Sequence, residues 1–233
     1  MKGSVLVTGG ARRIGFAICE ELSARGWNVL SHARDPDNPL CVDFTQPDAA
    51  ERLFAAAVAH APDLCAIVNN AAVFSTAAEM SPEDAARMMR VNFEVPTRLM
   101  ELLVTHLAAR HAVGTVVNLL DTRILGSLLG DGRPASRHSP YAASKLALAR
   151  VTVAHARRFA PTLRVNGVAP GPVLPPTDAA SREKGGDILL PRRPTPFDVA
   201  AAVAFLLEAD AMTGQVLAVD SGQHLLRPSG FVV

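Results

Sequence analysis

Short apolar runs alternate along the chain with longer segments in which apolar residues recur at helical spacing. Each short run is mainly apolar and shows no strict alternation with polar positions, which is typical of strands in a parallel sheet covered by helices on both faces. The runs occupy residues 5–7, 27–33, 41–43, 64–68, 115–120, 163–168 and 215–219. The pattern predicts an α/β fold, in which about seven strands form a doubly wound parallel sheet within a single domain over residues 1–233.

The segments with helical spacing predict helices at residues 13–25, 47–60, 81–110, 140–159 and 197–208. Ser81 followed by Pro82 is a helix start, and Pro96 should bend or split the long helix. No helix fits the sequence RDPDNPL at residues 34–40, so the connection there must be abbreviated. Residues 170–196 are rich in proline, which predicts an irregular segment that we interpret as a substrate loop.

The stretch SVLVTGGARRIG, Ser4 to Gly15, indicates a strand, a glycine turn and a helix that begins near Arg13. The first N–H groups of a helix have no intrahelical acceptor, and the helix dipole favours an anion there. Glycine lets a phosphate approach the backbone closely. The stretch therefore predicts a site for the pyrophosphate of a dinucleotide, with a plain loop as the alternative.

Ligands of doubly wound sheets bind in the crevice at the carboxyl ends of the strands. The candidate binding residues that directly follow predicted strands are Gly9, Arg34, Asp43, Asn70, Asp121, Pro170 and Gly171. We expect these residues to line one crevice.

The composition is ordinary for a globular protein, with 49% hydrophobic residues, 19% charged residues and a formal net charge of +1. This balance gives no reason to expect a nucleic acid or an anionic membrane as a partner. No apolar segment approaches the roughly 18 residues of a membrane span. The apolar run before the glycine turn is only a few residues long, so we do not expect it to be a signal peptide. Cys19, Cys41 and Cys65 lack metal-ligand spacing, so we expect reduced core thiols, no metal and a cytoplasmic location.

Tyr141 and Lys145 are four residues apart, so both side chains lie on one face of their predicted helix. A nearby ammonium favours the phenolate, and moving a tyrosine pKa from about 10 toward 7 takes roughly 4 kcal/mol. Such a tyrosine can transfer a proton at neutral pH. A surface pair at helical spacing is the alternative.

Together with TGGARRIG, NNAA at 69–72, Asn92 and PG at 170–171, the sequence YAASK at 141–145 resembles the classical short-chain dehydrogenase/reductase family over the whole chain. The resemblance implies a Rossmann-type fold and a nicotinamide cofactor. By this resemblance, Tyr141 is the general acid. Lys145 binds the nicotinamide ribose and lowers the pKa of the tyrosine, and Asn92 holds a water of the proton relay. The implied catalytic residues are Asn92, Asp121, Tyr141 and Lys145. The implied cofactor contacts are Gly9, Arg12, Arg13, Ile14, Arg34, Asp43, Phe44, Asn70, Ala71, Ala72, Tyr141, Lys145, Pro170, Gly171 and Val173.

Two residues depart from the family pattern in the same way as in pteridine reductases and dihydromonapterin reductases, which the chain resembles here. Arg13 replaces the middle glycine of TGxxxGxG, and Asp121 replaces the usual catalytic serine. Phe74 matches an aromatic residue that stacks over the pterin in that subgroup. The segment VDSGQHL near the end of the chain also resembles the C-terminal segment of the subgroup. The implied substrate contacts are Arg13, Phe74, Asp121 and Tyr141.

Each of these substrate residues also has a plainer interpretation. Phe74 could be a core residue, and Asp121 could cap the next turn. The separation of Asp121 from Tyr141, 141 − 121 = 20 positions, is longer than in most family members. That spacing leaves the catalytic role of Asp121 open.

The end of the second strand bears on the choice of nicotinamide. NAD-preferring members of such folds place an acidic residue there, whereas this chain has Ala33 followed by Arg34. A guanidinium can hold a 2′-phosphate bidentately, and Arg12 or Arg13 adds positive charge. We predict a preference for NADPH, which the neighbouring Asp35 opposes.

The resulting hypothesis is an NADPH-dependent reductase that transfers hydride to a pterin-type substrate, such as a dihydropterin, dihydromonapterin or dihydrofolate. A carbonyl or 3-oxoacyl reductase of the same family is the alternative, and a non-catalytic dinucleotide-binding sensor is the third. Family members are usually tetramers, and the 141–159 helix carries apolar residues on several faces. We therefore expect a homotetramer that acts on a small-molecule substrate.

Overall fold

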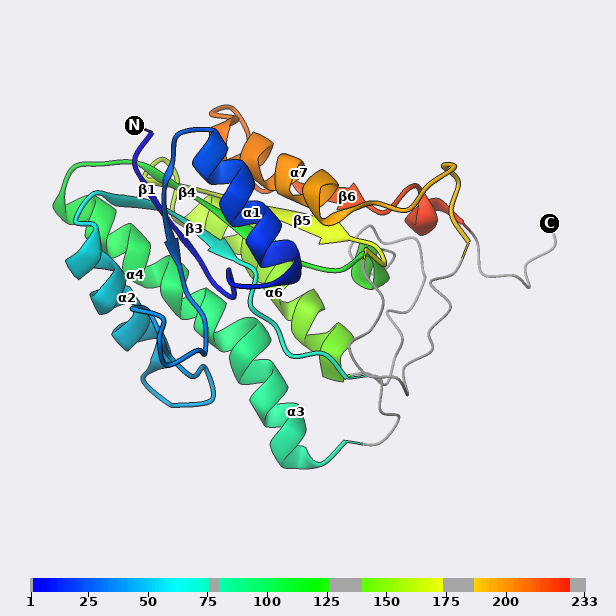
Figure 1. The fold of residues 1–233 in the computed structure, drawn as a ribbon, viewed down its shortest axis with the longest axis horizontal. Coiled ribbons are helices and arrows are strands. Elements are labelled where there is room, and N and C mark those ends of the chain that lie inside the picture. Colours follow the sequence, from blue (N-terminus) through cyan, green and yellow to red (C-terminus); the bar gives the residue numbers. More distant parts are fainter. Residues whose placement is uncertain (1, 76–79, 126–139, 174–186, 227–233) are drawn as a thin grey trace.

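The apolar runs of the sequence pair into one parallel sheet (Figure 1). The structure is a computed structural model that describes residues 2–75, 80–125, 140–173 and 187–226. The strands are β1 (Ser4–Val7), β2 (Asn28–Ser31), β3 (Leu64–Asn69), β4 (Gly114–Leu119), β5 (Leu163–Pro170) and β6 (Val216–Val219). Their order is β2-β1-β3-β4-β5-β6, and every neighbouring pair is parallel. The predicted doubly wound α/β fold is confirmed.

The sheet of the described chain has six strands, so the expected seventh strand at 41–43 was wrong. That run makes only an isolated parallel bridge, between Ala33 and Cys41. The connection over residues 34–40 contains no helix, as predicted, and two prolines that cannot donate to a ladder. A connection this short brings one residue pair into register without extending a strand.

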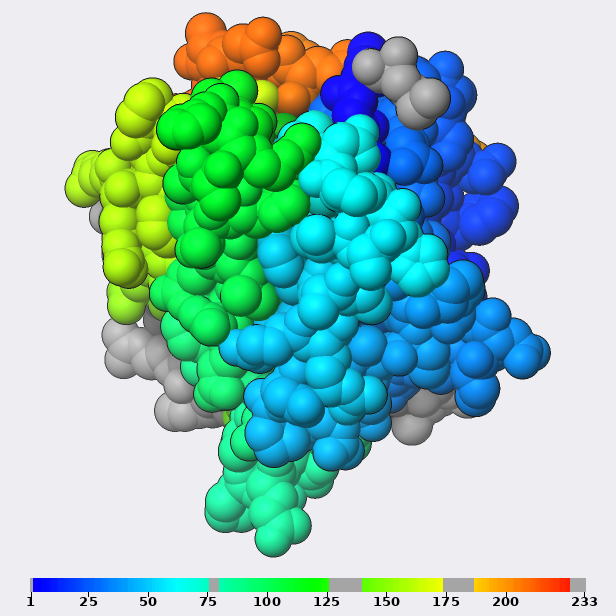
Figure 2. Space-filling view, turned by 90° about the vertical axis from the view of Figure 1, so that its left-hand side faces the viewer, coloured from blue at the N-terminus to red at the C-terminus, as the bar shows by residue number. Residues whose placement is uncertain are grey.

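Helices cover both faces of the sheet. They are α1 (Arg13–Ala24), α2 (Ala49–His60), α3 (Pro82–Met89), α4 (Val95–Ala109), α6 (Pro140–Arg158) and α7 (Pro196–Glu208). Helices α1 and α7 pack on one face, and α2, α4 and α6 pack on the other (Figure 1). Figure 2 shows α2, α4 and α6 side by side on the outer surface of the second layer, with α3 projecting beyond them. None of the helices in the described ranges is long and apolar enough to cross a membrane.

The long helical stretch that begins at Ser81 is divided, as predicted, although before Pro96. The Ser81 hydroxyl accepts a hydrogen bond from the N–H of Asp84 (3.1 Å) and caps α3. A π-helical turn at Arg90–Glu94 separates α3 from α4, and Pro96 lies in the first turn of α4. Proline has no N–H, so it cannot donate to the carbonyl of Asn92 four residues earlier. The wider turn accommodates this missing bond.

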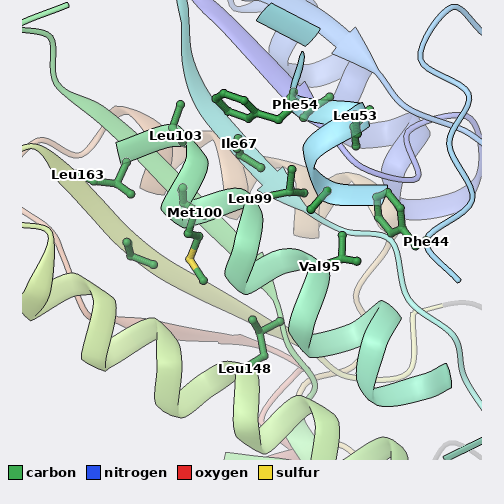
Figure 3. Packing of buried hydrophobic residues seen from close by; sticks show 14 of the residues in the cluster. Phe44, Leu53, Phe54, Ile67, Val95, Leu99, Met100, Leu103, Leu148 and Leu163 are labelled. Atoms are coloured by element: carbon green, nitrogen blue, oxygen red, sulfur yellow. The ribbon is translucent and has the colours of Figure 1, made fainter. Parts of the chain in front are cut away.

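The largest core cluster lies between the sheet and α4. Leu99, Met100 and Leu103 of α4 are fully buried and belong to one cluster with Ile67 of β3 (Figure 3). Phe44, from the segment after β2, belongs to the same cluster. This packing fixes the carboxyl ends of the strands and so positions the residues that follow them.

Candidate active site

The turn after β1 has the geometry that a dinucleotide phosphate requires. Gly9 has a φ of +65°, and a Cβ at Gly15 would collide with the Gly9 carbonyl oxygen. The Asn70 side-chain amide donates to the carbonyls of Thr8 (2.9 Å) and Gly9 (3.0 Å) and so ties the end of β3 to the turn. Arg13, in place of the family's middle glycine, has a φ of +56°. The family glycine thus falls at a left-handed position, which arginine occupies at a cost of about 1 kcal/mol.

A cavity of 340 Å³ opens beside this turn at the carboxyl ends of β1, β2 and β3. Ten of the predicted cofactor residues line it, namely Gly9, Arg12, Arg13, Ile14, Arg34, Asp43, Phe44, Asn70, Ala71 and Ala72. The N–H of Thr45 donates to the Asp43 carboxylate (2.9 Å), and this bond is the main cause that lowers the pKa of Asp43. An arginine-lined cavity with a glycine turn on one side fits an anionic dinucleotide.

The cavity also contains residues that sequence reasoning missed. Arg87 lines it from α3, one turn before Val91, and His32 lines it directly after β2. The sequence contained a signal for His32, because it is a polar residue at the carboxyl end of a mainly apolar strand. It contained no signal for Arg87, because the position of Arg87 depends on how α3 packs beside the sheet.

The chain brings Tyr141 and Asp121 into contact despite their separation in sequence. The Tyr141 hydroxyl donates to Oδ2 of Asp121 at 3.1 Å. The other carboxylate oxygen, Oδ1, accepts the N–H of Arg123 (2.8 Å) and caps the short 3-10 helix Thr122–Ile124. Asp121 is therefore both a cap and the partner of the tyrosine, and the longer spacing does not prevent the contact.

The pKa of Tyr141 is shifted opposite to the expected direction. Burial first, and then the charge and hydrogen bond of Asp121, raise the pKa of Tyr141 well above its usual value. The ammonium of Lys145 does not offset this shift, because it donates to the Leu119 carbonyl (2.7 Å) and lies 5.9 Å from the tyrosine ring centre. Burial lowers the pKa of Lys145 to about 8. The phenol is consequently protonated at neutral pH, as a proton donor must be.

The side chain of Asn92 is fully buried and completely engaged. Its Oδ1 accepts the N–H of Val73 (2.8 Å), and its Nδ2 donates to the Val73 carbonyl (2.9 Å) and to the Ser144 hydroxyl (3.1 Å). The amide thus joins the segment after β3 to α6. Pro96 lies four residues after Asn92 and has no N–H, so the Asn92 carbonyl lacks its α-helical donor.

Phe74 lies beside this cluster and is 44% exposed, so it is not a core residue. Its ring meets Tyr141 edge to face, with centroids 4.8 Å apart. The Arg123 guanidinium lies 5.1 Å from the Phe74 ring centre. Sequence reasoning missed Arg123, although its place two residues after Asp121 pointed to it.

A family model described as enoyl-(acyl carrier protein) reductase matches residues 9–224. The chain belongs to the short-chain dehydrogenase/reductase family. It is 30% identical to the dihydromonapterin reductase of Citrobacter koseri, over 95% of this chain and 96% of the relative. FolM alternative dihydrofolate reductase 1 of Brucella canis, solved with NADP, is 30% identical and has a TM-score of 0.82, over 98% of this chain and 96% of that one. The NADH-bound 3-ketoacyl-(acyl-carrier-protein) reductase of Brucella melitensis is 25% identical, with a TM-score of 0.82 over 95% of this chain and 98% of that one.

The remaining predicted cofactor residues of this short-chain dehydrogenase/reductase lie outside the cavity. Pro170 ends β5, and a Cβ on Gly171 would approach the Cβ of Asp220 to 2.7 Å. Val173 packs against the core cluster beneath α7. Residues 174–186 of the proline-rich segment 170–196 lie outside the described residues.

Proposed function

We propose that this reductase uses NADPH to reduce the C=N bond of a dihydropterin-type substrate, with dihydromonapterin and dihydrofolate as the candidates. The observation that carries the proposal is the Asp121–Tyr141 hydrogen bond (3.1 Å) beside the exposed ring of Phe74. A flat heteroaromatic ring can stack on Phe74 while one of its nitrogens faces the tyrosine hydroxyl. The similarity to dihydromonapterin reductase and to FolM supports the same substrate class.

NADPH, when bound, supplies the hydride, and the side chains supply the proton. Tyr141 carries that proton because burial and Asp121 keep its phenol neutral. In the structure the single O–H of Tyr141 points at Asp121, whose carboxylate is held by its cap on the next turn. For transfer the O–H turns from Asp121 to the substrate nitrogen. Lys145, held by the Leu119 carbonyl, would contact the nicotinamide ribose, and the carbonyl of Asn92 would hold a water that returns a proton to Tyr141.

The charges around the cavity favour NADPH over NADH. Arg12, Arg13, Arg34 and Arg87 all line it, and Arg34 lies three residues after the end of β2 at Ser31, on the side where a ribose 2′-phosphate would lie. Arginine provides a planar donor pair for a phosphate. The NADP-bound structure of FolM supports this choice.

A carbonyl or 3-oxoacyl reductase is the second candidate. It is favoured by the family model described as enoyl-(acyl carrier protein) reductase and by the similarity to the Brucella melitensis enzyme. In that case Tyr141 would protonate a carbonyl oxygen, and Asp121 would only orient it.

The assembly and location belong to the same proposal. Leu146 and Val151 remain partly exposed on α6, which supports a homotetramer built through this helix. Free, half-buried Cys19, Cys41 and Cys65 suit the reducing cytoplasm. We assign the proline-rich residues 170–196 to the substrate loop.

A substrate panel tests the proposal. NADPH oxidation is followed with dihydromonapterin, dihydrofolate and a 3-oxoacyl thioester, using wild type and Tyr141→Phe. Turnover of a dihydropterin that Tyr141→Phe abolishes is the expected result. Turnover of the thioester alone would replace the pterin by the second candidate, and NADPH binding without any turnover would favour a sensor.

A further inference from the structure

His32 makes two hydrogen bonds whose directions fix the state of its ring. The N–H of Gly9 donates to Nδ1 at 3.1 Å, and Nε2 lies 2.9 Å from the carbonyl oxygen of Val42. A backbone N–H can only donate and a carbonyl can only accept, so the ring is neutral and carries its proton on Nε2. Burial, which is the largest cause, lowers the pKa of His32 and supports the neutral form.

The same ring stacks on Phe44. The two rings are parallel within 3° and their centroids are 4.4 Å apart. Phe44 is 4% exposed and is anchored in the core cluster that contains Val95 and Leu99 (Figure 3). His32 therefore joins three parts of the cavity, namely the glycine turn, the end of β2 and the segment 42–44.

The short connection after β2 explains why such a joint is needed. Where a helix follows the second strand of such a sheet, its packing can position the residues beyond it. Here residues 34–40 contain no helix, and the sheet contact of the returning chain is the single bridge between Ala33 and Cys41. Asn38 adds one hydrogen bond, from its side-chain amide to the Ser31 carbonyl (3.1 Å). His32 provides the link from this segment to the phosphate turn.

We propose that His32 is a positioning residue that holds the glycine turn and the 42–44 segment at a fixed separation and thereby sets the affinity for NADPH. It takes no part in proton or hydride transfer. The inference rests on the cofactor half of the proposed function and not on the pterin substrate.

Two substitutions each keep one of the two hydrogen bonds. His32→Gln places an amide near the position of Nε2 and can still donate to Val42, but it leaves the Gly9 N–H without an acceptor. His32→Asn keeps an acceptor for Gly9 and loses Val42, and both variants lose the ring that stacks on Phe44. The dissociation constant of NADPH, from fluorescence titration, should rise at least about tenfold in each variant, because each loses one buried hydrogen bond together with this stacking. The kcat at saturating NADPH, with the substrate that turns over in the panel, should change less than about twofold.

His155→Gln is the matched control. His155 is also buried and packs against a phenylalanine, Phe159, at 4.5 Å, but it lies outside the cavity. NADPH should bind this variant as tightly as it binds wild type. An equal loss of affinity in His155→Gln, or wild-type affinity in both His32 variants, would overturn the proposal, as would a fall in kcat with the affinity unchanged.

The wild-type protein provides a measurement that does not depend on the folding of variants. Long-range ¹⁵N NMR of the histidine ring should show a neutral His32 protonated on Nε2, both with and without NADPH. A ring protonated on Nδ1, or an imidazolium at neutral pH, would contradict the assignment. Tight NADPH binding without reduction of any dihydropterin would refute the pterin substrate and leave this proposal standing.

Discussion

The structure predicts that Lys145 serves catalysis at the expense of stability. Burial lowers its pKa from the ordinary 10.5 to about 8, a difference equivalent to about 3 kcal/mol of folding free energy. The unfolded chain binds this proton more tightly than the folded protein. The penalty is therefore fully present below pH 8, and it is removed as the pH rises from about 8 toward 10.5.

Lys145→Met removes the buried charge and keeps most of the side-chain volume. The substitution also takes the donor from the Leu119 carbonyl, which costs about 1–2 kcal/mol. The net gain at neutral pH should be about 1–2 kcal/mol, or a rise in Tm of roughly 2–8 °C for a protein of this size. NADPH-dependent turnover should fall at least about a hundredfold, because the nicotinamide ribose loses the proposed contact with Lys145 that positions it.

Thermal unfolding of both proteins near neutral pH and at alkaline pH tests this reasoning. The stability advantage of Lys145→Met should shrink at the alkaline pH, where the wild-type penalty has disappeared. Lys2→Met is the control, because Lys2 forms an exposed ion pair with Glu208, and its stability should change by no more than about 1 kcal/mol. A lower Tm for Lys145→Met, or an advantage that does not depend on pH, would refute a destabilised buried ammonium.

Three further substitutions test single contacts. Asp121→Asn should lower the pKa of Tyr141, since the carboxylate raises it, and the tyrosinate absorbance reports this directly because Tyr141 is the chain's single tyrosine; an unchanged titration would contradict the contact. Arg34→Ala should raise the KM for NADPH about tenfold and leave that for NADH nearly unchanged; equal effects would remove Arg34 from the 2′-phosphate. Gly15→Ala should weaken NADPH binding, measured by titration, because its Cβ would collide with the Gly9 carbonyl; wild-type affinity would show that the turn adapts.

The arrangement of helices and strands could be predicted from local pattern, since continuous apolar runs and capping signals act within a few residues. Ser81 caps α3 as its sequence indicates. The run 41–43 was wrongly predicted as a strand because the apolar side chains in and beside it are buried in the core instead. Leu40, Val42 and Phe44 are buried against the core beside α2, without forming a ladder.

Site residues that lie together on one helix or one turn could be predicted from the sequence. Contacts between residues of separate segments could not. Helical spacing placed Tyr141 and Lys145 on one face, but the pKa of Tyr141 depends on Asp121, which arrives from another segment. The contacts of His32 and Arg87 with the cavity likewise arise from tertiary packing. Spacing along the chain contains no information about these distances.

The transfer of deuterium tests the central claim most directly. NADPH deuterated at the reactive carbon of its nicotinamide is incubated with the enzyme and dihydromonapterin, and the pterin product is analysed by mass spectrometry. We expect a tetrahydropterin that carries one deuterium with wild type and none with Tyr141→Phe. An unlabelled or unreduced pterin with wild type, under conditions in which a 3-oxoacyl thioester becomes labelled, would contradict the claim.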